Sequence, residues 1–135
     1  MSLDAARAAY PILVQMARDL ASSVREKRAV AWISYDELCA RCKEAGIKET
    51  PRTIMTKLLR PIQVACIERE WPDLSALFIQ KPKARGDFGN LIRPNDGWWE
   101  TYVQRGESTV GDVSFWFKRY QAARDFAEWP EAPFF

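Results

Sequence analysis

The sequence predicts an α+β fold: a winged helix-turn-helix with a small β-hairpin wing and added C-terminal helices. Three observations predict it. Capping signals and a glycine turn join two short helices, a basic hairpin follows them, and an aromatic helical pattern closes the chain. With 135 residues and 47% hydrophobic side chains, the chain can bury a core as one domain. We divide it into a winged-helix part, 1–93, and a helical extension packed on the same domain, 94–135.

The first two elements are a long helix and a short strand. Residues 4–26 place apolar side chains at three- and four-residue spacing, which is typical of an amphipathic helix: Leu13, Met16, Ala17, Leu20 and Val24. Pro11 suits the first helical position, in which case residues 4–10 form a separate turn. The β-prone run "AVAWIS" (29–34) then predicts a strand.

Two short helices follow, separated by a turn. Ser34 and Glu37 have the spacing of a capping box, so a helix should begin at Ser34. Gly46 stands where a left-handed C-terminal residue belongs, and Thr50-Pro51 supplies an N-cap and a first helical proline for the next helix. This spacing is that of a helix-turn-helix.

The second helix has one apolar and one polar side at 100° per residue. The apolar side holds Ile54, Met55, Leu58, Leu59, Ile62, Ala65 and Cys66. The polar side holds Arg52, Thr53, Thr56, Lys57, Arg60 and Gln63. Proline inside a helix removes a hydrogen bond, so Pro61 either kinks this helix or divides it into 51–60 and 61–69.

The remaining pattern predicts a hairpin and two helices. A strand at about 75–81, the turn "PKARGDFG" and the return strand "NLIR" (90–93) would form the wing. A helix that starts at Pro94-Asn95-Asp96 should end at Gly106. The last helix should span about 109–128, stopped by Pro130, and "EAPFF" reads as a tail.

Composition excludes several function classes. The chain has no histidine, which removes histidine bases, Ser-His and Cys-His nucleophile pairs and histidine metal sites. Three cysteines and no signal peptide favour a reduced, cytoplasmic setting, and no apolar run is long enough to span a membrane. The net charge is only +2, but residues 41–60 hold an excess of basic groups. Local basicity of this kind favours a polyanionic partner.

We therefore predict non-catalytic binding of nucleic acid, with double-stranded DNA as the partner. The N-terminal half of the second helix would enter a major groove, and the wing would contact the backbone. The helix residues are Arg52, Thr53, Thr56, Lys57 and Arg60, and the wing residues are Lys81, Lys83 and Arg85. The alternative is a solvated polar side on an interaction-only module.

Three other patterns have a structural and a functional interpretation. Cys39-x-x-Cys42 lies in mid-helix on an apolar stripe, which favours a buried role over a metal or redox site. A Mg²⁺ cluster is conceivable from Asp73, Asp87, Asp96 and Glu100, although loop carboxylates usually cap turns. We predict no cofactor. For Trp98 and Trp99 the functional interpretation is stacking on unpaired bases, and packing in the core or against a subunit is favoured over it. Trp98, Trp99 and Trp116 also form the predicted contact with a protein partner or second copy. An adaptor or subunit of phage or defence-system type is thus the second function.

The stretch "ISYDELCARCKEAGIKETPRTIMTKLL" resembles the winged-helix half of DNA alkyltransferases and alkyltransferase-like proteins. Ser34, Tyr35, Leu38, Gly46 and Arg52 occupy matching places. The resemblance implies that Tyr35 and Arg52 help to flip a base. The reactive Pro-Cys-His-Arg motif of that family is absent, so alkyl transfer is not implied. Residues 10–93 are also similar in layout to a group of uncharacterised bacterial and phage winged-helix proteins, which implies a fold more than an activity.

Overall fold

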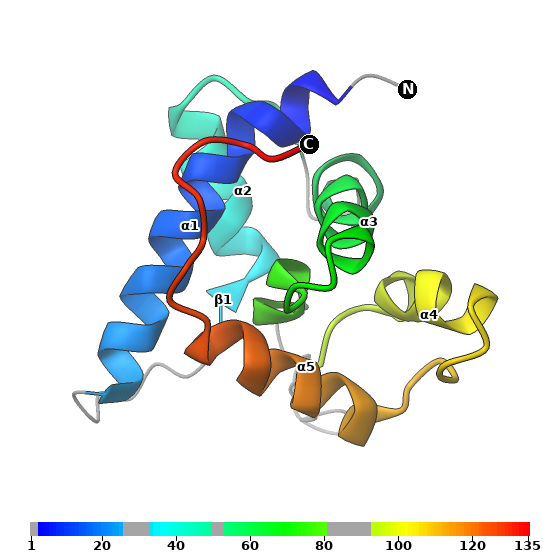
Figure 1. Cartoon of the computed structure of the whole chain (residues 1–135). Coiled ribbons are helices and arrows are strands. Elements are labelled where there is room, and N and C mark those ends of the chain that lie inside the picture. The colour runs from blue at the N-terminus through cyan, green and yellow to red at the C-terminus, as the bar shows by residue number, and fades with distance from the viewer. Residues whose placement is uncertain (1–2, 26–32, 50–52, 81–92) are drawn as a thin grey trace, which may run out of the picture.

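The computed structural model describes residues 3–25, 33–49, 53–80 and 93–135, which form a helix-rich mixed α and β structure (Figure 1). In chain order the elements are α1 (Asp4–Arg25), β1 (Ile33–Ser34), α2 (Tyr35–Glu44), a π-helical turn (Met55–Leu59), α3 (Arg60–Glu68), a 3-10 turn (Leu74–Leu77), β2 (Phe78–Ile79), a second 3-10 turn (Asp96–Trp99), α4 (Glu100–Gln104) and α5 (Val113–Asp125). In none of the described ranges does a helix have the length and apolar character needed to cross a bilayer.

The sheet pairs two strands that are far apart in the sequence. β1 and β2 are parallel, with Ile33 opposite Phe78 and Ser34 opposite Ile79. The predicted strand 75–81 is shorter than expected because its first part forms the 3-10 turn. Most of the predicted wing lies outside the described residues. At its base the Gln80 N–H donates to the Arg93 carbonyl at 3.2 Å, so the chain returns beside β2. The winged helix stays a prediction.

Helix α1 is continuous through Pro11, so the expected separate turn at 4–10 is wrong. Pro11 lies on the exposed side of the helix. Ala6, Ala9 and Tyr10 before it are fully buried, as is Leu13 after it. The burial of one apolar stripe on both sides of the proline outweighs its local cost, because most helical stability in proteins comes from packing.

The predicted caps of α2 are confirmed. The Ser34 hydroxyl oxygen accepts a hydrogen bond from the Glu37 N–H at 3.2 Å. At the other end Gly46 has φ +83°, and the Ile47 N–H donates to the Cys42 carbonyl at 2.8 Å. This is the left-handed glycine termination expected from the sequence. The N-cap predicted at Thr50-Pro51 lies outside the described residues.

Pro61 does not divide the second helix, which runs without a break through residues 54–68. The turn before it is π-helical, and the Arg60 N–H donates to the Met55 carbonyl five residues back. In an α-helix the proline ring would press on the carbonyl four residues earlier, at Lys57. The wider turn accommodates the proline by changing the helix locally, so the helix continues without a break.

The C-terminal elements contribute the largest side chains of the core. Trp98 and Trp99 are fully buried, and Trp116 is 4% exposed. Helix α5 is shorter than the predicted 109–128, because Gly111 has φ +85° and the Asp112 carboxylate caps the helix by accepting from the Phe115 N–H. The expected tail packs along α1 instead of projecting away (Figure 1).

Candidate nucleic-acid interface

The exposed polar side of helix 54–68 is narrower than its sequence pattern predicts. Of the predicted contact residues, Thr56 and Lys57 are exposed to solvent. The opposite side of the same turns is buried in the core through Ile54, Met55, Leu58, Leu59 and Ile62. The helix is therefore fixed on one side, and on the other it presents one hydroxyl and one ammonium group from its N-terminal half.

Arg60, also predicted to contact nucleic acid, is engaged within the protein. Its Nη1 donates to Glu100 Oε2 at 2.9 Å and its Nη2 donates to the Gly97 carbonyl at 2.5 Å. The side chain is only 26% exposed. Because guanidinium bonds to a carboxylate and a carbonyl fix both donor groups, Arg60 joins α3 to the start of α4. A DNA contact of Arg60 stays a prediction and would compete with these bonds.

Two further polar residues of this helix lie differently from the simple helical pattern. Thr53 is half-buried, and its hydroxyl donates to Glu49 Oε2 at 2.7 Å. Gln63 was expected on the polar side, but it is fully buried. The π-helical turn adds a residue to one turn, so positions after it do not follow the 100° spacing counted from Arg52. The remaining predicted residues, Arg52, Lys81, Lys83 and Arg85, lie outside the described residues.

The buried Gln63 belongs to a polar network centred on Asp73, which is 2% exposed. Asp73 Oδ1 accepts from the Ser75 N–H at 3.0 Å and from its hydroxyl at 2.5 Å. Oδ2 accepts from the Tyr102 hydroxyl at 2.7 Å and from Gln63 Nε2 at 3.2 Å. Trp98 completes the network by donating from its indole to the Ser75 hydroxyl at 3.1 Å. Burial raises the pKa of Asp73, while these hydrogen bonds act in the opposite direction.

This arrangement does not favour the alternative of a metal cluster. The donors around Asp73 leave it enclosed by hydrogen bonds, Asp96 is paired with Arg93, and Glu100 is paired with Arg60. Asp87 lies outside the described residues. In the part of the chain that the structure describes, no group of three or more metal-ligating side chains is gathered.

The three cysteines are buried and free of disulfides, as their place on the apolar stripe predicted. Burial raises the pKa of Cys39 to about 11 and that of Cys66 to about 12. The pKa of Cys42 is also raised, again chiefly by burial. The thiolate is the reactive and metal-binding form, so these values favour an inert structural role over redox chemistry.

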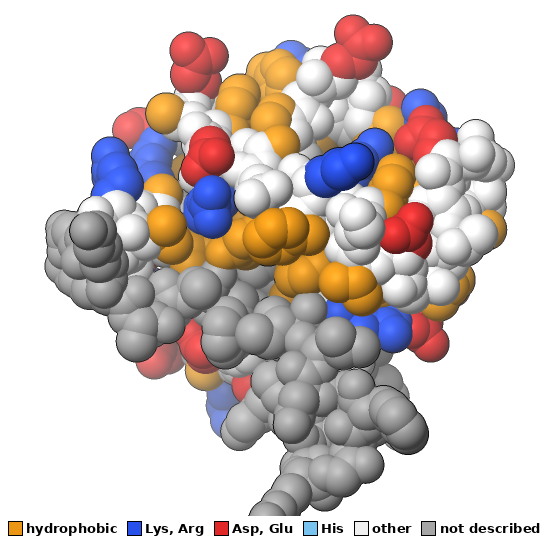
Figure 2. Space-filling model, turned by 90° about the horizontal axis from the view of Figure 1, so that it is seen from below, with side chains coloured by type: hydrophobic (Ala, Val, Ile, Leu, Met, Phe, Trp, Pro, Cys, Tyr) orange, Lys and Arg blue, Asp and Glu red, His pale blue; other side chains and the backbone are white. Residues whose placement is uncertain are grey.

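The aromatic residues expected to meet a partner are core residues. Trp98, Trp99 and Trp116 are buried, so the predicted aromatic contact surface does not consist of them. Another aromatic side chain is available on α5: Phe117 is 45% exposed and stacks on Tyr120 with ring centroids 5.7 Å apart. Figure 2 views the α5 side of the molecule and shows hydrophobic side chains joined in a band there.

Tyr35, which the resemblance to alkyltransferase-like proteins associates with base flipping, is 3% exposed. Its hydroxyl accepts a hydrogen bond from the Asn95 N–H at 3.1 Å, and burial raises its pKa. This side chain packs α2 against the segment before α4 and does not reach the surface. Comparisons with protein-family models, curated proteins and solved structures give no match.

Proposed function

We propose that this protein binds double-stranded DNA without catalysis, through a winged helix-turn-helix in which helix 54–68 is the recognition element. The observation that carries the proposal is the position of Thr56 and Lys57. Both are exposed on the N-terminal half of a helix that the core holds on its other side. Recognition helices present polar and basic side chains to the major groove from this half.

Each candidate residue has a distinct part in this proposal. Lys57 contacts a phosphate, and Thr56, together with Arg52 and Thr53 at the helix start, lies near base edges and phosphates. Lys81, Lys83 and Arg85 belong to the wing and contact the backbone. Arg60 holds the recognition helix against α4, so we expect it to influence binding mainly through the position of the helix.

Fluorescence anisotropy with labelled random duplex DNA, at low and moderate salt, tests the proposal. We expect Thr56→Ala/Lys57→Glu to weaken binding roughly tenfold and to lower the salt slope by about 1. Lys118→Glu is the matched control, because Lys118 is an exposed lysine on α5 and its replacement makes the same charge change. A second variant, Lys81→Gln/Lys83→Gln/Arg85→Gln, tests the wing.

Two results would contradict DNA binding by this helix. The first is no binding of the wild type to duplex DNA at micromolar protein and low salt. The second is an equal loss of affinity in the Lys118→Glu control, which would mean that only the net charge matters. Loss of binding in the helix variant but not in the wing variant would retain the helix and remove the wing from the proposal.

A protein-interaction role is the second candidate, in an adaptor or subunit of phage or defence-system type. The exposed Phe117 on α5 favours it, because this ring offers a partner an apolar contact. The tryptophans predicted for that role are buried. Light scattering over a range of protein concentrations would detect association with a second copy. We expect Phe117→Ser to reduce such association and Val103→Ser to leave it unchanged, since Val103 is an exposed apolar residue of α4. A monomer at all concentrations would oppose self-association.

A further inference from the structure

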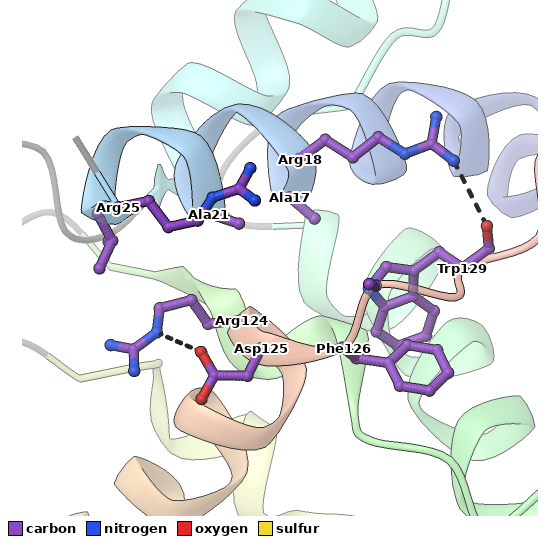
Figure 3. Close-up of a pocket in the computed structure, with 10 residues that line it drawn as sticks. Ala17, Arg18, Ala21, Arg25, Arg124, Asp125, Phe126 and Trp129 are labelled. Carbon is purple, nitrogen blue, oxygen red and sulfur yellow. Dashed lines mark hydrogen bonds and ion pairs between the residues drawn. The ribbon is translucent and has the colours of Figure 1, made fainter.

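A hollow of about 270 Å³ lies between the second half of α1 and the end of α5 (Figure 3). None of its lining residues comes from helix 54–68, so it is separate from the proposed DNA-binding side. A space of this volume suits one anionic group with a compact organic body.

The charged side chains around the hollow are mostly basic. Arg18, Arg25 and Arg124 line it, and Asp125 is the acid among the lining residues. Arg124 Nε donates to Asp125 Oδ1 at 3.1 Å, while Arg18 makes a long 3.5 Å bond to the Trp129 carbonyl. The Arg124 guanidinium also lies over the Tyr120 ring, 5.5 Å from its centroid. Each guanidinium has five N–H donors, so donor capacity remains beyond these contacts among the described residues. An anion would meet an excess of positive charge.

Trp129 provides a second and independent observation. The residue is 5% exposed, and its indole Nε1 is buried without a hydrogen-bond partner among the described residues. Figure 3 shows the ring at one end of the hollow with its nitrogen on the side of the hollow, where the atom itself is covered. An unpaired buried N–H is unfavourable, and an acceptor bound in the hollow would relieve it. Because the nitrogen is covered, the ring must tilt slightly to meet that acceptor.

The rest of the lining is apolar, with Ala17, Ala21, Val24 and Phe126 among its residues. Small side chains on α1 leave room between the helices, and the Phe126 ring offers an aromatic surface. A bare inorganic anion would be bound by the arginines but would leave this apolar surface without a contact. A ligand with both an oxyanion and an apolar group matches both parts.

We propose that this hollow is a binding site for a small organic oxyanion, a phosphate monoester or carboxylate that carries a compact apolar group. Arg25 and Arg124, at one end of the hollow, bind the oxyanion. At the other end, beside Arg18, the Trp129 N–H donates to an acceptor group of the ligand. The apolar group packs against Phe126 and the alanines of α1.

Isothermal titration calorimetry with phenyl phosphate, benzoate, inorganic phosphate and benzyl alcohol tests the site on the full chain. We expect binding of phenyl phosphate or benzoate, weaker binding of inorganic phosphate, and none of neutral benzyl alcohol. Arg25→Gln/Arg124→Gln should weaken binding roughly tenfold or more, because charge-assisted hydrogen bonds are lost. Arg105→Gln is the matched control, since Arg105 pairs with Glu107 and does not line the hollow.

Trp129→Phe tests the indole donor while it retains an aromatic ring, and thermal unfolding checks that the variant is folded. We expect a several-fold loss of affinity, and a ligand-induced change of tryptophan fluorescence that disappears with Trp129. The proposal is overturned if neither organic anion binds at millimolar concentration, or if the arginine variant and the Arg105→Gln control bind equally well. Inorganic phosphate as tight as phenyl phosphate would overturn the organic part of the assignment.

Discussion

At the scale of single residues, the buried Asp73 carboxylate determines how the C-terminal part is attached. It accepts hydrogen bonds from Ser75, Tyr102 and Gln63, which come from three different parts of the chain. A buried carboxylate with four donors is well solvated by the protein, yet burial still raises its pKa above the usual 3.8. Its ionised form is therefore disfavoured in the folded protein relative to the unfolded chain.

This raised pKa predicts a specific pH dependence. The folded state holds the Asp73 proton more tightly than the unfolded state, so stability from this group is greatest below about pH 3.8 and falls as pH rises through the folded pKa. We expect wild type to gain unfolding free energy relative to Asp73→Asn as the pH is lowered from neutrality. Urea unfolding of both proteins at several pH values measures the difference. Parallel curves would contradict the raised pKa.

Arg60 gives the second prediction at this scale. Its bonds to Glu100 and the Gly97 carbonyl lie within the protein, so Arg60→Gln should lower the free energy of unfolding by about 1 kcal/mol, the group being partly exposed. Lys57→Gln is the control, because Lys57 is fully on the exposed side and should change stability by less than about 0.5 kcal/mol. Equal losses of unfolding free energy in the two variants would contradict a structural role for Arg60.

At the scale of elements, the π-helical turn shows how packing and local preference are reconciled. Proline in an α-helix interior costs about 3 kcal/mol relative to alanine. In this helix the Met55–Leu59 turn already accommodates the ring of Pro61. We therefore expect Pro61→Ala to stabilise the protein by less than about 1 kcal/mol, as measured by urea unfolding. A gain in unfolding free energy close to about 3 kcal/mol would mean that Pro61 is strained in the folded protein.

The local signals in the sequence predicted the elements better than they predicted the surface of helix 54–68. The caps at Ser34 and Gly46 depend on neighbouring residues only, and both are found as expected. The π-helical turn is different, because it depends on a proline two residues beyond it and on burial on both sides. It changes which residues face outward, so Gln63 could not be recognised as buried from a regular 100° spacing.

The candidate sites were harder to predict, for the same physical reason. Arg18, Arg25 and Arg124 read as the polar sides of two separate helices, and only the packing of α1 against the end of α5 brings them to one hollow. Likewise, the contact between Arg60 and Glu100 is a tertiary property, because the two residues are forty positions apart in the sequence. The type of element depends on residues that are close in the sequence, whereas contacts between distant residues depend on how the elements pack.

At the scale of the whole molecule, the C-terminal tail connects the two ends of the chain. The Tyr10 hydroxyl donates to the Pro130 carbonyl at 2.7 Å, and Arg69 donates to the Phe134 carbonyl at 3.1 Å. The Phe134 ring packs on Trp71 with centroids 4.7 Å apart and meets Tyr10 edge-on at 5.5 Å. The tail therefore covers apolar surface of α1 and of the turn after α3.

This packing predicts that the tail contributes to global stability. Phe134→Ala should lower the free energy of unfolding by about 1–2 kcal/mol, less than a full core truncation because the ring is half-buried. Glu131→Ala, an exposed residue of the same tail, is the control and should have little effect. Thermal unfolding followed by circular dichroism compares the two. An unchanged midpoint for Phe134→Ala would show that the tail is dispensable.

Arg7 Nε donates a hydrogen bond to the Phe135 carbonyl at 2.6 Å, which ties the last residue of the sequence to α1. Phe135 therefore lies beside the first turns of α1. A domain fused after Phe135 would begin beside these turns of α1 and would compete with the hydrogen bond of Arg7 for the same space.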